Sequence, residues 1–168
     1  MLRTKQATGH RIANQTEKQR VSTMKTFATI ASALVLSLSL SAGVAHAGSN
    51  KLLLDQWGFG NSFGSSQSGK WNKAGASQTG LFNDGIIKQK GKGNTAALGQ
   101  VGVFNSGSID QTGKWNTAGI GQTGAFNSGS IKQKGKHNGG VILQNGVGNE
   151  ADVSQTGNGN TAVVLQDN

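Results

Sequence analysis

Residues 94–104 read NTAALGQVGVF, and Asn105 then begins the same phrase again. Each unit has an Asn at its first position, a Gln at the seventh and a Gly at the ninth. This eleven-residue unit repeats without insertion or deletion from Asn50 to Gln166. A strict short period that fills a chain is typical of a repeat architecture, so this unit decides the fold.

The invariant positions form three sets, which are the candidate structural residues. The Asn set of the expected core ladder is Asn50, Asn61, Asn72, Asn83, Asn94, Asn105, Asn116, Asn127, Asn138, Asn149 and Asn160. The Gln set of that ladder is Gln56, Gln67, Gln78, Gln89, Gln100, Gln111, Gln122, Gln133, Gln144, Gln155 and Gln166. The expected turn glycines are Gly58, Gly69, Gly80, Gly91, Gly102, Gly113, Gly124, Gly135, Gly146 and Gly157.

The segment from each Asn to its Gln alternates in character. The second and fourth residues after the Asn are mostly small or apolar, as in Ala96 and Leu98, and the residues between them are mostly polar or Gly. Period two over seven residues predicts a half-buried strand with Asn and Gln on its buried face. An eleven-residue period is also that of a right-handed coiled coil. Each interior glycine costs about 1 kcal/mol in a helix, which favours the strand.

The four residues between a Gln and the next Asn have Gly second, and Gly adopts φ > 0 without a steric penalty. We therefore expect the chain to reverse there, with two strands and two turns in each coil of 22 residues. Stacked coils would lie about 4.8 Å apart. Identical amides would then form hydrogen-bonded columns, as in amyloid ladders. The predicted fold class is all-β, an amyloid-like β-solenoid.

The segment ahead of the repeats has a different composition. Residues 24–47 have the order of a secretory signal peptide, with Lys25, an apolar run from Phe27 and an A-x-A site at 45–47. Residues 1–23 are expected to be an over-called start or an unstructured extension, and residues 48–168 a single repeat domain. The whole chain has a net charge of +9 and no Cys, which excludes disulfides and thiolate metal sites.

Two stretches resemble the curlin repeat, Q-x-G-x-G-N-x-A-x-x-x-Q. They are QKGKGNTAALGQ at 89–100 and QTGNGNTAVVLQ at 155–166, and the register extends over residues 50–166. The resemblance implies a secreted subunit of curli, the bacterial extracellular amyloid fibres of the biofilm matrix, which support adhesion and cell aggregation. It also implies partners: other copies of the chain, another curlin-type subunit, as major subunit or nucleator, and an outer-membrane export system. No membrane span is expected in the mature chain.

Two features depart from the family pattern. Major curlin subunits have a Gly-rich leader for export, and only Gly48 and Ser49 precede Asn50 after the expected cleavage site. In the segments that begin at Asn83, Asn105 and Asn127, Gly replaces the family's Ala two residues after the Asn.

Alternate connections differ in chemistry, so a two-strand coil places them on opposite edges. One edge would stack aromatic and aliphatic residues: Trp57, Phe59, Leu81, Phe82, Val103, Phe104, Phe126 and Val147. The other edge would stack lysines: Lys70, Lys90, Lys92, Lys114, Lys134 and Lys136. The aromatic residues would cap the core. The lysines would either keep the fibre soluble or bind anionic matrix polymers such as DNA or acidic polysaccharide.

The two ends of the array are apolar on both faces. Leu52, Leu53 and Leu54 lie in the first segment, and Val163, Val164 and Leu165 lie in the last. Monomeric proteins protect such edges with Pro, charge or a capping element, and this chain contains no Pro. We therefore expect these residues to be assembly edges that dock head to tail.

The sequence offers no catalytic, cofactor or metal site, so we expect no enzyme and no cofactor. The acidic residues of the repeats are scattered, and His137 stands alone in a connection. The leading hypothesis is a self-assembling fibre subunit. The alternative is a monomeric secreted β-solenoid that binds glycan, ice or an anionic polymer through a stacked turn edge.

Overall fold

The computed structural model describes residues 49–168, so the predictions for residues 1–23 and 24–47 lie outside the described residues. Residues 49–168 contain no helix long and apolar enough to cross a membrane. They form eleven strands: β1 (Lys51–Phe59), β2 (Ser62–Lys70), β3 (Lys73–Leu81), β4 (Asp84–Lys92), β5 (Thr95–Val103), β6 (Ser106–Lys114), β7 (Thr117–Ala125), β8 (Ser128–Lys136), β9 (Gly139–Val147), β10 (Glu150–Asn158) and β11 (Thr161–Asp167).

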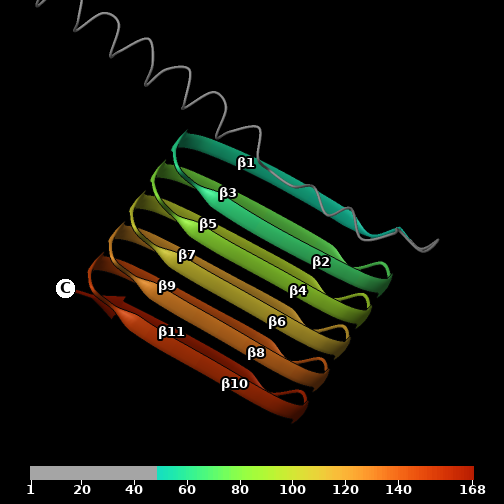
Figure 1. Ribbon diagram of the computed structural model, residues 1–168. Helices are drawn as coiled ribbons and strands as arrows, with labels where there is room; N and C mark the ends of the chain where they lie inside the picture. The colour runs from blue at the N-terminus through green and yellow to red at the C-terminus, as the bar shows by residue number, and fades with distance from the viewer. Residues whose placement is uncertain (1–48) are drawn as a thin grey trace, which may run out of the picture. The chain divides into compact units, whose positions relative to one another are not determined.

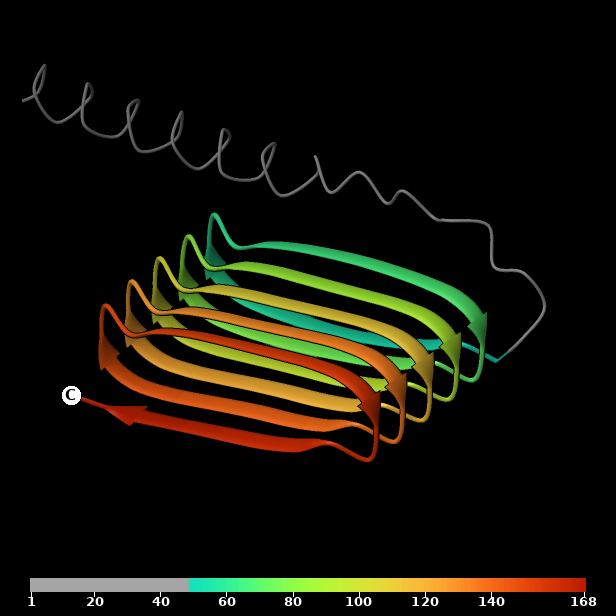
Figure 2. The ribbon, with the colours of Figure 1, turned by 90° about the horizontal axis from the view of Figure 1, so that it is seen from below.

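The strands form two parallel sheets that face each other, and the chain crosses between them at every turn (Figures 1 and 2). Odd-numbered strands make sheet A in the order β1-β3-β5-β7-β9-β11, and even-numbered strands make sheet B in the order β10-β8-β6-β4-β2. Each residue pairs with the residue 22 positions later, as Gln78 does with Gln100. The predicted β-solenoid with two strands in each 22-residue coil is therefore confirmed.

The strands are longer than the sequence pattern predicts. The sequence pattern predicts connections of four residues, but only Gly60 and Asn61 lie between β1 and β2. The connection is shorter because backbone pairing continues past the turn glycine to Phe59. The reversal has two residues with positive φ, Gly58 at +113° and Gly60 at +68°. The repeat pattern predicts only the first of them.

A side chain at the turn glycines has no room. A Cβ on Gly58 would overlap the carbonyl oxygen of Gly80, which is the equivalent residue one coil later. Its φ of +113° is also a conformation that residues with a Cβ rarely adopt. Stacking of the backbones and the turn conformation therefore both require glycine at this position.

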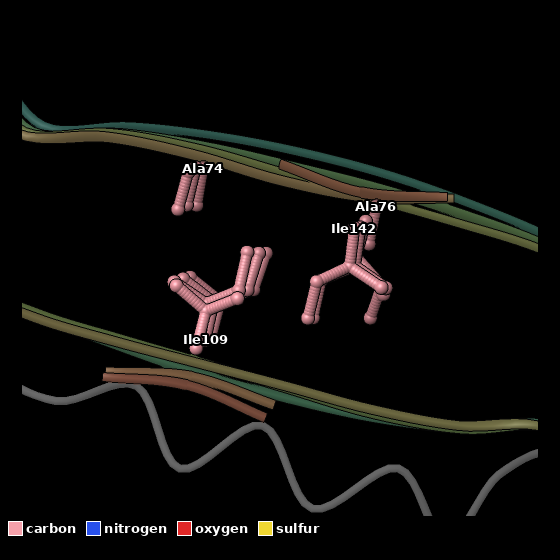
Figure 3. Close-up of a cluster of buried hydrophobic side chains, with 11 residues drawn as sticks. Ala74, Ala76, Ile109 and Ile142 are labelled. Carbon is pink, nitrogen blue, oxygen red and sulfur yellow. The ribbon is translucent and has the colours of Figure 1, made fainter. Parts of the chain in front are cut away.

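The core is built by opposing small residues in one sheet to large residues in the other. Figure 3 shows the Ala74 column of sheet A above the Ile109 column of sheet B, with the Ile142 column beside them. The column of sheet A that contains Leu98 faces glycines of sheet B. A Cβ on Gly85 or Gly107 would overlap the methyl groups of Leu98. This complementarity explains why Gly replaces the family's Ala in the segments that begin at Asn83, Asn105 and Asn127.

This packing predicts that Gly107→Ala lowers the free energy of unfolding by about 1–3 kcal/mol, because the new methyl group overlaps Leu98 in a filled core. The matched control is Gly119→Ala, in the same kind of strand, where a Cβ meets no atom within 4 Å. The control should be neutral or slightly stabilising. Urea denaturation of freshly purified protein measures both, and equal midpoints would contradict the proposed packing.

Candidate functional site

The Gln column is a continuous ladder along the stack. Each Gln from Gln78 to Gln144 donates from Nε2 to Oε1 of the Gln 22 residues later, at 2.7–2.9 Å. The same Nε2 donates to a backbone carbonyl 16 residues earlier on the opposite sheet, as Gln111 does to Thr95 at 3.0 Å. Each Gln therefore joins two coils and both sheets, and its amide is satisfied within the protein interior.

The Asn column makes a different set of bonds. Oδ1 of Asn94 accepts from the backbone N–H of Asn116 at 3.1 Å and from its Nδ2 at 3.2 Å. Nδ2 of Asn116 donates in turn to the carbonyl of the turn glycine Gly135 at 3.2 Å. The Asn thus fixes the turn as well as the stack. The repeat pattern predicts the amide-to-amide contacts but not these backbone bonds, although the constant spacing from Gly to Asn is a signal for them.

Burial makes both ladders energetically important. From Asn72 to Gln155, every Asn and Gln of the two sets is at most 8% exposed. A buried amide that lacks a partner costs about 1–3 kcal/mol. The exposed or half-buried members lie in the outermost coils: Asn50, Asn61, Asn160, Gln56, Gln67 and Gln166.

The ladders have a direction, which leaves complementary groups at the two ends. Gln56 and Gln67 accept no hydrogen bond at Oε1 from any residue in 49–168, because no Gln precedes them by one coil. At the other end, Nε2 of Gln155 and of Gln166 donates only to a backbone carbonyl. One end of the described stack therefore offers amide acceptors where the other offers amide donors.

The expected assembly edges lie at opposite ends of the described stack, in β1 and β11. Leu53, Val163 and Leu165 point outward and are 77%, 60% and 71% exposed. Leu52, Leu54 and Val164 point inward, and Val164 packs against the core cluster. The structure does not bring the two groups together within one copy, because the whole stack separates them.

One turn edge carries a ladder of aromatic rings. The ring centroids of Phe82 and Phe104 are 5.1 Å apart, and those of Phe104 and Phe126 are 5.3 Å apart, in near-parallel planes. All three residues have φ between +54° and +57°, a left-handed conformation that costs about 1–2 kcal/mol outside glycine. The repeat pattern predicts the rings on this edge but not their backbone conformation.

The other edge carries the lysines. Lys70, Lys92, Lys114 and Lys136 are consecutive partners in the sheet register, which makes a column of four like charges. Lys90 and Lys134 flank it in a second column, with Thr112 between them. Nζ of Lys92 lies 4.3 Å from the ring centroid of Trp71, within the range of a cation–π contact.

Within residues 49–168, no group of three or more His, Cys, Asp or Glu could hold a metal ion. His137 is exposed in a turn, with φ of +56°.

Comparison with known proteins finds one family. A family model of the curlin-associated repeat matches residues 105–135, 124–157 and 135–167. No curated protein matches the chain. The eleven-residue register of the matched region continues unchanged through residues 50–104.

The Asn geometry predicts that Asn116→Asp lowers the free energy of unfolding by at least about 3 kcal/mol, because it buries an unpaired charge. The replaced Nδ2 faces three acceptor oxygens, on Asn94, Thr112 and Gly135. The matched control is Asn158→Asp at an exposed strand end, which should change stability little. Urea denaturation distinguishes them, and a tolerated Asn116→Asp would contradict a structural ladder.

Proposed function

The chain belongs to the curlin-repeat family, and on that premise we propose that it is a subunit of extracellular amyloid fibres that assembles head to tail. The family is structural, and its known members are subunits of curli fibres outside the cell. In this proposal the fibres of this protein support the biofilm matrix, adhesion and cell aggregation. The chain is secreted after removal of residues 24–47, and it uses no cofactor.

The observation that carries the proposal is the pair of open ends. Both sheets end in unpaired strands, β1 and β2 at one end and β10 and β11 at the other. The donors and acceptors of the Gln ladder are complementary between the two ends. A second copy that docks there repeats the contacts that join consecutive coils within one copy. Its partners are further copies of the chain, with another curlin-type subunit and an outer-membrane export system as accessory components.

The first test is whether residues 48–168 form fibres at all. We expect thioflavin fluorescence to rise and fibre diffraction to show reflections near about 4.8 and 10 Å, the strand and sheet spacings. A persistently soluble monomer rich in β-structure would instead favour the alternative of a monomeric binding module for glycan, ice or an anionic polymer.

A single substitution should block assembly without disturbing the fold. Gly139 N–H donates to the carbonyl of Asn160, so outward residues of sheet A direct their N–H groups to the next coil. Val163 is outward in the last strand of that sheet, so its N–H points to the open edge. Val163→Pro removes this donor, and we expect loss of fibre formation and capping of wild-type fibres when the two are mixed.

The control for this experiment is Val163→Thr, which keeps the N–H and has a side chain of similar size. It should form fibres at close to the wild-type rate. Undiminished fibre formation by Val163→Pro would refute docking through this edge.

A second role can coexist with the first. We propose that the lysine edge binds anionic matrix polymers such as DNA or acidic polysaccharide. The supporting observation is the uninterrupted column of Lys70, Lys92, Lys114 and Lys136, which repeats a positive charge about every 4.8 Å along the stack. By contrast, Asp110 separates Lys88 from Lys132 in the register of sheet B.

The binding experiment compares two quadruple variants of equal net charge. One replaces the column, Lys70, Lys92, Lys114 and Lys136, by Gln. The control replaces four lysines outside it by Gln: Lys51, Lys73, Lys88 and Lys132. We expect only the column variant to lose at least about tenfold in affinity for DNA and to show a shallower salt dependence. Equal affinities of the two variants, or binding that is insensitive to salt, would contradict the proposal.

A further inference from the structure

The two sheets of the described stack are unequal. Sheet A has six strands and sheet B has five, so the stack spans five and a half coils. At one end β11 extends one strand beyond β10, and at the other end β1 lies one strand before β2 in the winding order. Each end of the stack is therefore a step of half a coil.

We propose that successive copies join with a rotation of about 180° around the stack axis, so that β1 of the next copy pairs with β10 and its β2 pairs with β11. This arrangement rests on the proposed function, since it specifies how the head-to-tail contact is made. If β1 instead paired with β11, sheet A would continue while sheet B lacked one strand at the junction. A half-turn fills both sheets, because the strands of the two sheets run in opposite directions.

The half-turn continues both amide ladders. Gln155 donates to Oε1 of Gln56 in the next copy, and Gln166 donates to its Gln67. Asn149 and Asn160 accept no hydrogen bond at Oδ1 from residues 49–168, although every Asn from Asn50 to Asn138 accepts one from the next coil. In the junction they accept from Asn50 and Asn61 of the next copy. No ladder atom is left without its partner.

The side chains at the junction fit this register. Ala162 of one copy faces Leu54 of the next, a small residue against a large one, while Val164 faces Leu52. On the outer surface, Glu150 lies beside Lys51 of the next copy. If β1 paired with β11, Asp55 would lie beside Leu165 and Trp57 beside Asp167.

The half-turn also determines the fibre surface. The aromatic edge of one copy is followed by the lysine edge of the next along each side of the fibre. Each side then alternates between the two chemistries with a rise of about 26 Å per copy, given a coil spacing of about 4.8 Å.

Helical reconstruction of fibres of residues 48–168 by electron cryomicroscopy tests the inference. We expect a rotation close to 180° and a rise of about 26 Å per copy, from eleven strands in two sheets. Pairing of β1 with β11 would instead give a rotation near 0° and a rise of about 29 Å, and that result would overturn the inference while the proposed fibre function stands. Absence of fibres would overturn both.

A matched variant has an even number of strands. A chain that ends at Gly157 lacks β11 and has ten strands, equal numbers in the two sheets. Its copies should stack with a rotation near 0° and a rise of about 24 Å. If this variant does not fold, the rotation measured for the eleven-strand chain still decides the question. A half-turn in fibres of both chains would show that strand parity does not set the rotation, and would overturn the inference.

Discussion

The whole structure depends on burying amides that are paired only when the coils are in exact register. Asn and Gln side chains fill the ends of the core cross-section, and the buried apolar residues between them are mostly alanine and isoleucine. A buried amide is stabilising when its donors and acceptor are satisfied and costly when they are not. A shift of one residue would turn every inward side chain outward and break both ladders. The uninterrupted eleven-residue period is the sequence counterpart of this constraint.

The turns are part of the same constraint. Nδ2 of Asn116 bonds the carbonyl of Gly135 in the connection of the next coil, so the Asn ladder holds the turns in place. Six connections end in Trp, Phe or His with φ near +60°, where glycine would be unstrained. The rings compensate by covering the preceding coil: Phe82 lies over Gly60 and Trp115 over Gly93. Strain in the backbone is thus balanced by contacts that exist only in a stack.

Most of the fold could be predicted from the sequence, because period two within a unit and period eleven between units are direct consequences of strand geometry. A turn glycine in every unit predicts the coil of two strands. In such a coil alternate connections lie on opposite edges, which predicts the aromatic edge and the lysine edge. The sequence did not reveal that Gly85 and Gly107 leave space for Leu98, because that requires knowing which columns face each other. Nor did it reveal the second positive φ, since Phe and Trp at that position give no signal of it. The proposed pairing of strands across copies also depends on the number of strands in each sheet, which only the structure gives.

In the proposed fibre, the contacts that fold this chain are also those that join successive copies. An inner coil has a neighbour on both sides, whereas β1 and β11 have one each, and nothing in residues 49–168 distinguishes the missing contact from the ones already made. In the proposed fibre, folding and assembly are then one process that adds coils. The bonds between Gln side chains all run from a Gln to the Gln one coil later, and those between Asn side chains from an Asn to the Asn one coil earlier. A copy added in the reverse direction would therefore oppose donor to donor or acceptor to acceptor in both ladders. The ladders therefore predict that the proposed fibre is polar as well as regular.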